Sequence, residues 1–175
     1  MHELNRMTVR EYKNVAKLPV VIVLDNIRSQ NNIGSVFRTA DAFRISEIHL
    51  CGITAKPPHR EIHKTALGST ESVAWKYFPE TIDSIRELKK DGFTICSVEQ
   101  TTGSIPLDRF YPGENEKLAL IFGNEVHGVG ESLIKESDYC LEIPQYGTKH
   151  SLNIAVTSGI IIWDLFGKIK SPVKM

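Results

Sequence analysis

Hydrophobic residues in this chain form two kinds of pattern that alternate along the sequence. Short runs such as Val20–Leu24 and Leu118–Phe122 are apolar at every position, which is typical of parallel strands buried on both faces of a sheet. Between such runs, apolar residues recur at helical spacing, as from Ile33 to Phe43, where they fall on one stripe. The alternation predicts an α/β fold with a mostly parallel sheet and helices on both faces.

The predicted elements follow from these runs and from the turn residues between them. Strands are expected at 20–24, 47–51, 72–78, 93–98, 118–122 and 139–143. Helices are expected at 33–43, 61–67, 79–90, 131–136 and 151–167, after a short basic helix at about 4–17. Asn32 and Ser151 are placed to cap two of these helices, and Pro79 to open a third. No linker or repeat interrupts the pattern, so residues 1–175 are predicted to form one domain.

The last predicted helix is apolar on every side. Its apolar residues are Leu152, Ile154, Ala155, Val156, Ile160, Ile161, Ile162, Trp163, Leu165 and Phe166. A helix of this kind must be covered on every side, and a sheet covers only one face. We therefore expect the other face to meet a second copy of the chain in a two-fold dimer. The alternative is a helix buried entirely within one chain.

Charge and cysteine usage narrow the class of protein. The chain has 21 basic and 21 acidic residues, so a nucleic-acid partner must be held by a local patch and not by net charge. Such a patch is possible on the basic N-terminal helix, whose charged face is otherwise simply solvated. The three cysteines, Cys51, Cys96 and Cys140, show no C-x-x-C spacing and are expected as buried free thiols. With no signal-peptide core and no membrane-spanning run, we expect a cytoplasmic protein without a membrane partner.

Candidate chemistry gathers where predicted strands end, because ligands of parallel sheets bind beyond the carboxyl ends of the strands. Three such ends are unusual in residue content: 31–34 (Asn-Asn-Ile-Gly), 123–125 (Gly-Asn-Glu) and 144–147 (Pro-Gln-Tyr-Gly). Gly34 would let another backbone or a ligand approach closely. Glu125 can be a loop acid, a capping group or an active-site residue.

Arg38 lies on the helix face opposite the apolar stripe. Alone it is an ordinary solvated arginine, and only another subunit or a ligand over that face makes it functional. His59 and His63 are spaced for a shared metal, but the glutamate of H-R-E-I-H stands outside the usual zinc patterns, so a surface helix that touches phosphate is the preferred interpretation. No serine, histidine and acid are recognisable in the sequence as a catalytic triad.

The three strand ends, in this order and spacing, resemble the SpoU/TrmH family of RNA ribose 2′-O-methyltransferases, in the SPOUT superfamily. The motifs read N-N-I-G-S-V-F-R-T-A from Asn31, L-A-L-I-F-G-N-E-V-H-G-V from Leu118 and I-P-Q-Y-G-T-K-H-S-L-N-I-A-V from Ile143. The resemblance implies a deep C-terminal trefoil knot, S-adenosylmethionine (SAM) as cofactor, RNA as partner, and a homodimer that forms through the C-terminal helix near the site. No metal is implied.

The resemblance also assigns residues. The family's backbone contacts to the cofactor fall on Gly123, Ile143 and Leu152, and its polar active-site positions fall on Arg38, Asn32, Glu125, Ser151 and Asn153. A guanidinium is a poor base, so we expect Arg38 to stabilise charge on the attacking ribose oxygen, oriented by Glu125 and Ser151. Asn32 is expected to position Arg38 or an RNA phosphate.

The expected function is SAM-dependent methylation of a ribose 2′-hydroxyl in structured RNA. Transfer RNA is favoured over ribosomal RNA, because the chain lacks the extra N-terminal domain of several ribosomal-RNA members. Gln145 departs from the family, where methionine is common after Ile-Pro. The alternatives are a catalytically silent RNA-binding dimer of the same fold and a metal-dependent hydrolase built on His59 and His63.

Overall fold

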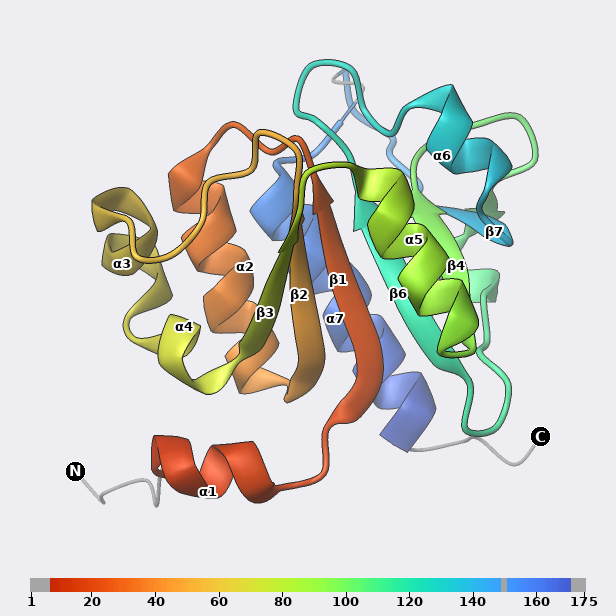
Figure 1. Cartoon of the computed structure of the whole chain (residues 1–175). Coiled ribbons are helices and arrows are strands. Elements are labelled where there is room, and N and C mark those ends of the chain that lie inside the picture. The colour runs from red at the N-terminus through yellow and green to blue at the C-terminus, as the bar shows by residue number, and fades with distance from the viewer. Residues whose placement is uncertain (1–6, 149–150, 171–175) are drawn as a thin grey trace.

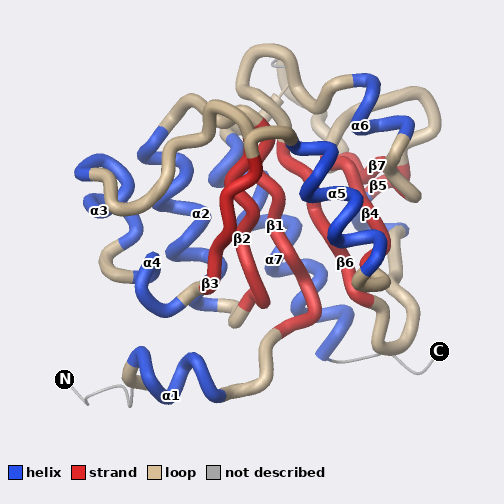
Figure 2. Tube along the Cα trace, viewed as in Figure 1, coloured by secondary structure: helices blue, strands red, loops and turns tan. Residues whose placement is uncertain are grey.

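A single parallel sheet runs through the middle of the molecule (Figures 1 and 2). The computed structural model describes residues 7–148 and 151–170. The strands are β1 Leu18–Asp25, β2 Ile45–Cys51, β3 Ala74–Phe78, β4 Phe93–Val98, β5 Ile105–Pro106, β6 Lys117–Phe122 and β7 Tyr139–Glu142. Their order across the sheet is β3-β2-β1-β6-β4-β7-β5, and every pairing is parallel. The predicted α/β class is confirmed.

Helices cover both faces of this sheet, as predicted. They are α1 Val9–Asn14, α2 Gln30–Ala42, α3 Arg60–Ala66, α4 Ser69–Ser72, α5 Thr81–Lys90, α6 Glu131–Lys135 and α7 Ile154–Lys170, with a 3₁₀ turn at Leu107–Arg109. Figure 1 shows α5 and α6 on the near face and α2 and α7 on the far face. The buried apolar residues divide accordingly into two clusters, one on each side.

The packing of β1 explains why its residues 20–24 are all apolar. Val20, Ile22 and Leu24 belong to the cluster on the α2 and α7 side, whereas Val21 and Val23 belong to the cluster on the α5 and α6 side. Successive side chains of a strand point to opposite faces, so a strand covered on both faces needs an unbroken apolar run.

Helix α2 begins earlier than the sequence predicted. The side chain of Ser29 caps it, with Oγ accepting the Asn32 N–H at 3.3 Å, so the prediction that Asn32 is the cap is wrong. Gly34 allows α3 to pack closely, because a Cβ there would lie 2.3 Å from the Ile62 carbonyl oxygen. The close neighbour of Gly34 is therefore another backbone segment.

Several other boundaries also differ from the prediction. Helix α5 is preceded by Glu80 as its cap residue, so Pro79 stands outside it. Ser72 ends α4 and is not part of β3. Ser151 precedes α7 by three positions, and the carboxamide oxygen of Asn153 instead accepts the Ala155 N–H at 2.9 Å. These shifts leave the order of the predicted elements intact.

The N-terminal basic segment forms a short helix with one anchored side chain. Helix α1 has a capping box between Thr8 and Glu11 and ends at Asn14, before Lys17. Tyr12 is buried under it, and its hydroxyl donates to the Ala40 carbonyl oxygen at 3.4 Å. The predicted start of this helix, near residue 4, lies outside the described residues.

Helix α7 has one buried face and one open face. Ile154, Ile161, Ile162 and Leu165 join the core, and the helix packs against α2. On the other side, the apolar residues Val156, Ile160 and Trp163 are 51%, 39% and 66% exposed. The alternative that α7 is buried entirely within one chain is therefore wrong.

Candidate active site

A cavity of about 560 Å³ lies at the carboxyl ends of β6, β4 and β7. Its walls come from segments 98–100, 122–128, 141–145 and 151–157, which are far apart in the sequence. Gly123, Ile143 and Leu152, the three residues predicted to bind a cofactor, all line it, and so do Glu125, Ser151 and Asn153. The structure thus brings together two of the three unusual strand ends as walls of one cavity.

Segment 123–129, which we call the Glu125 loop, is held tightly over the end of β6. A Cβ on Gly123 would lie 2.1 Å from the carbonyl carbon of Gly128, so only glycine fits where the loop closes on itself. The Asn124 side chain donates to the Asn26 carbonyl oxygen at 2.8 Å and accepts the Val126 N–H at 2.9 Å. Asn124 therefore fixes the Glu125 loop against the segment that follows β1.

Glu125 links this loop to the start of α2. Its carboxylate accepts the Arg28 N–H at 3.1 Å and the Ser29 N–H at 3.0 Å. Partial burial alone would raise the pKa of Glu125, but these backbone donors and the Asn32 side chain outweigh it and lower the pKa below its ordinary value. Glu125 is thus a carboxylate at neutral pH.

Asn32 and Asn153 join the front of the chain to its tail. The Asn153 side-chain nitrogen donates to the Asn32 oxygen at 3.1 Å, across 121 positions of sequence. Because Ser29 takes the capping role, the side chain of Asn32 is available for this contact. The first and third motifs therefore meet beside the cavity.

Arg38 stands apart from the predicted cluster. It lies six positions after Asn32 on α2, about 9 Å along the helix axis, and its side chain is exposed. Among residues 7–148 and 151–170, no hydrogen bond or ion pair joins Arg38 to Glu125 or Ser151. The predicted orientation of Arg38 by these two groups is thus not present within a single described chain.

Two cavity residues were missed by the sequence analysis. Glu99 directly follows β4 and lines the cavity, and Asn124 holds the Glu125 loop in place. The signal that drew attention to Glu125, a carboxylate directly after a buried strand, also applies to Glu99. Asn124 had no signal of its own beyond its place in the motif.

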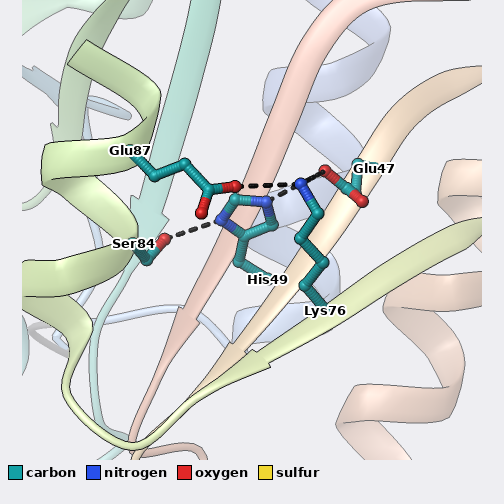
Figure 3. Close-up of polar contacts among 5 residues, drawn as sticks. All are labelled: Glu47, His49, Lys76, Ser84 and Glu87. Carbon is teal, nitrogen blue, oxygen red and sulfur yellow. Dashed lines mark hydrogen bonds and ion pairs between the residues drawn. The ribbon is translucent and has the colours of Figure 1, made fainter. Parts of the chain in front are cut away.

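A serine, a histidine and an acid do lie in line elsewhere in the molecule (Figure 3). Ser84 Oγ lies 2.7 Å from His49 Nδ1, and His49 Nε2 lies 3.1 Å from Glu47 Oε2. Ser84 and His49 are 0% and 1% exposed, so no substrate can reach them. Lys76 binds Glu47 at 3.3 Å and Glu87 at 2.9 Å, which ties the group to β3 and α5. This cluster is structural.

One histidine of the pair considered as a possible metal site has a structural role. His59 is the cap of α3, and its Nδ1 accepts the Glu61 N–H at 3.2 Å. No cluster of three or more His, Cys, Asp or Glu side chains able to hold a metal occurs in the described part of the chain.

The cysteines add little further chemistry. Cys51, Cys96 and Cys140 are free, and burial raises the pKa of the Cys51 thiol to about 12 and also raises that of Cys96. A buried thiol with a raised pKa is a poor nucleophile.

None of the helices in residues 7–148 and 151–170 is both long and apolar enough to cross a bilayer.

Some of the known proteins that are similar to this chain are named as ribosomal-RNA enzymes, and others are named as transfer-RNA enzymes. It is 26% identical over 150 residues to the 23S rRNA (guanosine-2'-O-)-methyltransferase RlmB of Neisseria meningitidis, covering 86% of this chain and 59% of that protein. It is 27% identical over 165 residues to the tRNA (guanosine(18)-2'-O)-methyltransferase of Thermus thermophilus, covering 93% of this chain and 81% of that protein. The chain therefore spans little more than half of the first relative.

The fold is similar to that of a solved, cofactor-bound enzyme. The AdoMet-bound rRNA methyltransferase from Sinorhizobium meliloti superimposes with a TM-score of 0.79 at 28% identity, over 88% of this chain and 59% of that chain. The family model described as SpoU rRNA Methylase family matches residues 19–163, which contain all three motifs and every wall of the cavity. On these grounds the chain belongs to the SpoU rRNA Methylase family.

Proposed function

We propose that this protein transfers a methyl group from SAM to a ribose 2′-hydroxyl of structured RNA. The observation that carries the proposal is the cavity formed by the second and third motifs, with Asn32 of the first motif tied to its edge through Asn153. Membership of the SpoU family and the similarity to an AdoMet-bound methyltransferase support it.

The residues present fit SAM. A cavity of about 560 Å³ lies within the size range of small-molecule sites, roughly 300 to 1,000 Å³. Gly123, Ile143 and Leu152 lie outside helices and strands, so their backbone N–H and C=O groups are not committed to a ladder and can serve the edge of an adenine ring. The apolar side chains of Ile143 and Leu152 suit the faces of that ring.

In this proposal, the polar residues at the edge of the cavity position the RNA and stabilise charge. When bound, SAM supplies a methyl group whose bond to a positively charged sulfur breaks as its bond to the ribose oxygen forms. Arg38 stabilises the negative charge that develops on the attacking oxygen, whose proton leaves to water. Glu125, Ser151, Asn153 and Asn32 hold the surrounding backbone and the RNA in place.

The same proposal includes a two-fold dimer that covers the open face of α7. Val156, Ile160 and Trp163 follow one another at helical spacing and leave an apolar stripe exposed. A Cβ on Gly159 or Gly167 would meet no atom of the described chain within 4 Å, which leaves room for a second helix to approach. A partner over α2 and α7 would also supply the groups that Arg38 lacks within one chain.

We further propose the deep trefoil knot of the C-terminal segment. Segments 122–128 and 151–157, from the second and third motifs, line the same cavity, so the residues that precede α7 lie close to the Glu125 loop. This closeness of the two motifs supports threading there.

Transfer RNA in the cytoplasm is the preferred substrate. The tRNA (guanosine(18)-2'-O)-methyltransferase of Thermus thermophilus, similar to this chain over 93% of its residues, supports this preference. Recognition of folded RNA depends on shape and on phosphate contacts. Residues 7–148 and 151–170 contain no metal cluster that would favour the hydrolase alternative.

The test is a map of ribose methylation across total RNA from cells with and without this protein. The proposal expects at least one 2′-O-methyl position, in transfer RNA, that disappears without the protein and returns with it. Purified protein and SAM should restore that position in the undermethylated RNA. Identical maps from the two cell lines would count against the proposed activity and would favour the silent RNA-binding dimer.

A further inference from the structure

A second cavity, of about 510 Å³, lies apart from the candidate active site. Its walls come from segments 57–60, 62–63 and 70–71 and from Trp75 of the edge strand β3. We call it the Trp75 pocket. None of these residues lines the first cavity, and the volume lies within the range of small-molecule sites, roughly 300 to 1,000 Å³. The Trp75 pocket is therefore a separate candidate binding site.

The apolar walls of the Trp75 pocket suit a flat aromatic ring. Trp75 packs against the core cluster on the α2 side but stays partly exposed, and the rings of Pro57 and Pro58 line the pocket with it. The base of an unpaired nucleotide is flat, and such bases stack on aromatic side chains of proteins. A nucleobase therefore matches these walls.

Two hydrogen-bond donors of the lining suit a phosphate. Arg60 is 86% exposed and lies 4.0 Å from Glu61, whose carboxylate is bound by Lys64 at 2.7 Å. His59 Nδ1 accepts the Glu61 N–H at 3.2 Å, so the neutral ring carries its proton on Nε2 and can donate it. A guanidinium supplies charge and paired donors for phosphate oxygens, and the imidazole adds a third donor.

Glu71, an acidic residue of the same lining, suits the edge of a base. An ionised carboxylate only accepts hydrogen bonds, so it repels a phosphate and attracts N–H groups. The Watson–Crick edge of guanine carries two adjacent N–H donors, which match the two oxygens of a carboxylate. The same edge of uracil has one N–H between two carbonyl acceptors, so guanine is the better partner for Glu71.

The Trp75 pocket lies next to the helix that carries the first motif. Thr65 Oγ1 of α3 donates to the Asn31 carbonyl oxygen of α2 at 2.9 Å, and the Ile62 backbone packs on Gly34. Helix α3 is thus packed against the start of α2, where Asn32 is tied to the first cavity (Figure 1). Because the axes of packed helices lie about 8 to 10 Å apart, one RNA strand can span both places.

We propose that the Trp75 pocket binds an unpaired nucleotide of the RNA substrate, separate from the nucleotide that is methylated. Its base stacks on Trp75 with its N–H donors toward Glu71, and its phosphate lies against Arg60 and His59. The choice of RNA as the ligand rests on the proposed function. The pocket also gives the H-R-E-I-H segment the phosphate contact that its sequence predicted.

The first measurement is the binding of free nucleotides, which needs no methyl transfer. With S-adenosylhomocysteine present to fill the first cavity, guanosine 5′-monophosphate should quench the tryptophan fluorescence of the wild-type protein saturably. Trp75→Phe keeps an aromatic wall and leaves Trp163 as the other tryptophan, so it should bind the nucleotide in equilibrium dialysis without quenching. This pair of readouts separates stacking on Trp75 from a loss of folding.

The base edge is tested with a second nucleotide. Uridine 5′-monophosphate should bind the wild-type protein about fivefold more weakly than guanosine 5′-monophosphate, because it offers Glu71 one donor fewer. Glu71→Gln should reduce this preference. Glu131→Gln, the same change at an exposed position of α6, is the control and should keep it.

The second measurement concerns RNA. Arg60→Ala should raise the KM for undermethylated transfer RNA by about tenfold, because a charged contact to phosphate is lost. Its kcat and its affinity for SAM should stay unchanged, since the chemistry takes place in the first cavity. Arg86→Ala, at an exposed arginine of α5 on the other face of the sheet, is the matched control.

The contrary outcomes are distinct. Normal methyl transfer with an unchanged KM in Arg60→Ala, and no quenching by millimolar guanosine 5′-monophosphate, would overturn this inference alone. Quenching that persists in Trp75→Phe would place the nucleotide elsewhere and also overturn it. A wild-type protein that binds the nucleotide at Trp75 but transfers no methyl group to RNA would overturn the proposed function and leave the nucleotide site standing.

Discussion

Two polar clusters in this protein use the same kinds of side chain but differ in access. The cluster of Glu47, His49 and Ser84 is buried between the sheet and α5, and its core members are almost inaccessible to solvent. The cluster around Glu125 and Asn32 lies open at the carboxyl ends of the strands, beside a cavity. Residue type alone would favour the first as a catalytic site, whereas burial makes it a structural element.

The comparison predicts that substitutions at the two clusters affect different properties of the protein. Changes at the open cluster should remove activity and leave the fold. Changes at the buried cluster should lower stability and leave the activity of the folded fraction. Four substitutions follow, beginning with the largest expected effect, and two of them, His49→Ala and Glu125→Gln, change the clusters themselves.

Arg38→Ala should cost the most activity. Removing one group that stabilises charge in a transition state typically lowers kcat by about 100- to 1,000-fold. Cofactor affinity should stay near that of wild type, because Arg38 does not line the cavity. Single-turnover methyl transfer and a SAM titration on the same sample measure both quantities. Arg86→Ala, an exposed arginine on α5, is the matched control, and normal turnover by Arg38→Ala would refute the assignment.

Ile160→Asp should break the proposed dimer. A charge in the centre of an apolar interface typically costs at least about 2 kcal/mol, or about 30-fold in affinity. Sedimentation should show a shift from dimer to monomer, together with a loss of methyl transfer. Leu67→Asp makes the same change at another exposed apolar residue and should leave both unchanged. A wild type that sediments as a monomer at working concentration would show that α7 does not form the interface.

His49→Ala should lower stability and little else. The change leaves a cavity and deprives Ser84 and Glu47 of a partner, at a cost of about 2 to 4 kcal/mol. In a chain of this size that loss corresponds to about 2 to 4 °C in Tm for each kcal/mol. Thermal melts and activity per folded molecule measure the two effects, with His63→Ala, an exposed histidine, as the control. A folded His49→Ala protein without methyl transfer would break the proposed division.

Glu125→Gln should change the pH dependence slightly. The pKa of Glu125 is lower in the folded protein than its ordinary value, so the carboxylate stabilises the fold above about pH 4.3, and this contribution is lost as pH falls through the folded pKa. Glu125 is exposed, so solvent screening limits the effect to below about 1 kcal/mol. Urea melts between about pH 6 and pH 3 should show a smaller loss for Glu125→Gln than for wild type. Equal slopes would mean that the backbone contacts of Glu125 add nothing.

The sequence predicted the fold well because the central strands β1 and β6 are buried on both faces. An unbroken apolar run such as Val20–Leu24 has few alternatives to a central parallel strand, and the helices between such runs follow from their spacing. β5 was missed because Ile105–Pro106 has only two residues and no periodicity. The cap of α2 was misplaced because Ser29 and Asn32 are equally good capping residues, and only the backbone decides between them.

The sequence predicted which residues line the site better than it predicted the contacts between them. Positions whose role belongs to the backbone, such as Gly123, fall at strand ends, which the sequence reveals. Contacts between distant segments, such as Ser84 with His49 or Asn153 with Asn32, depend on how strands order in the sheet, which spacing does not encode. The surroundings of Arg38 depend in turn on what covers α2 and α7.

The most direct test of the central claim is a calorimetric titration of the wild-type protein with SAM at neutral pH. We predict saturable binding at one site per chain, in the cavity lined by the Glu125 loop and by segments 141–145 and 151–157. A protein that is folded, as judged by a cooperative thermal melt, and that gives no binding signal with SAM would contradict the proposed function.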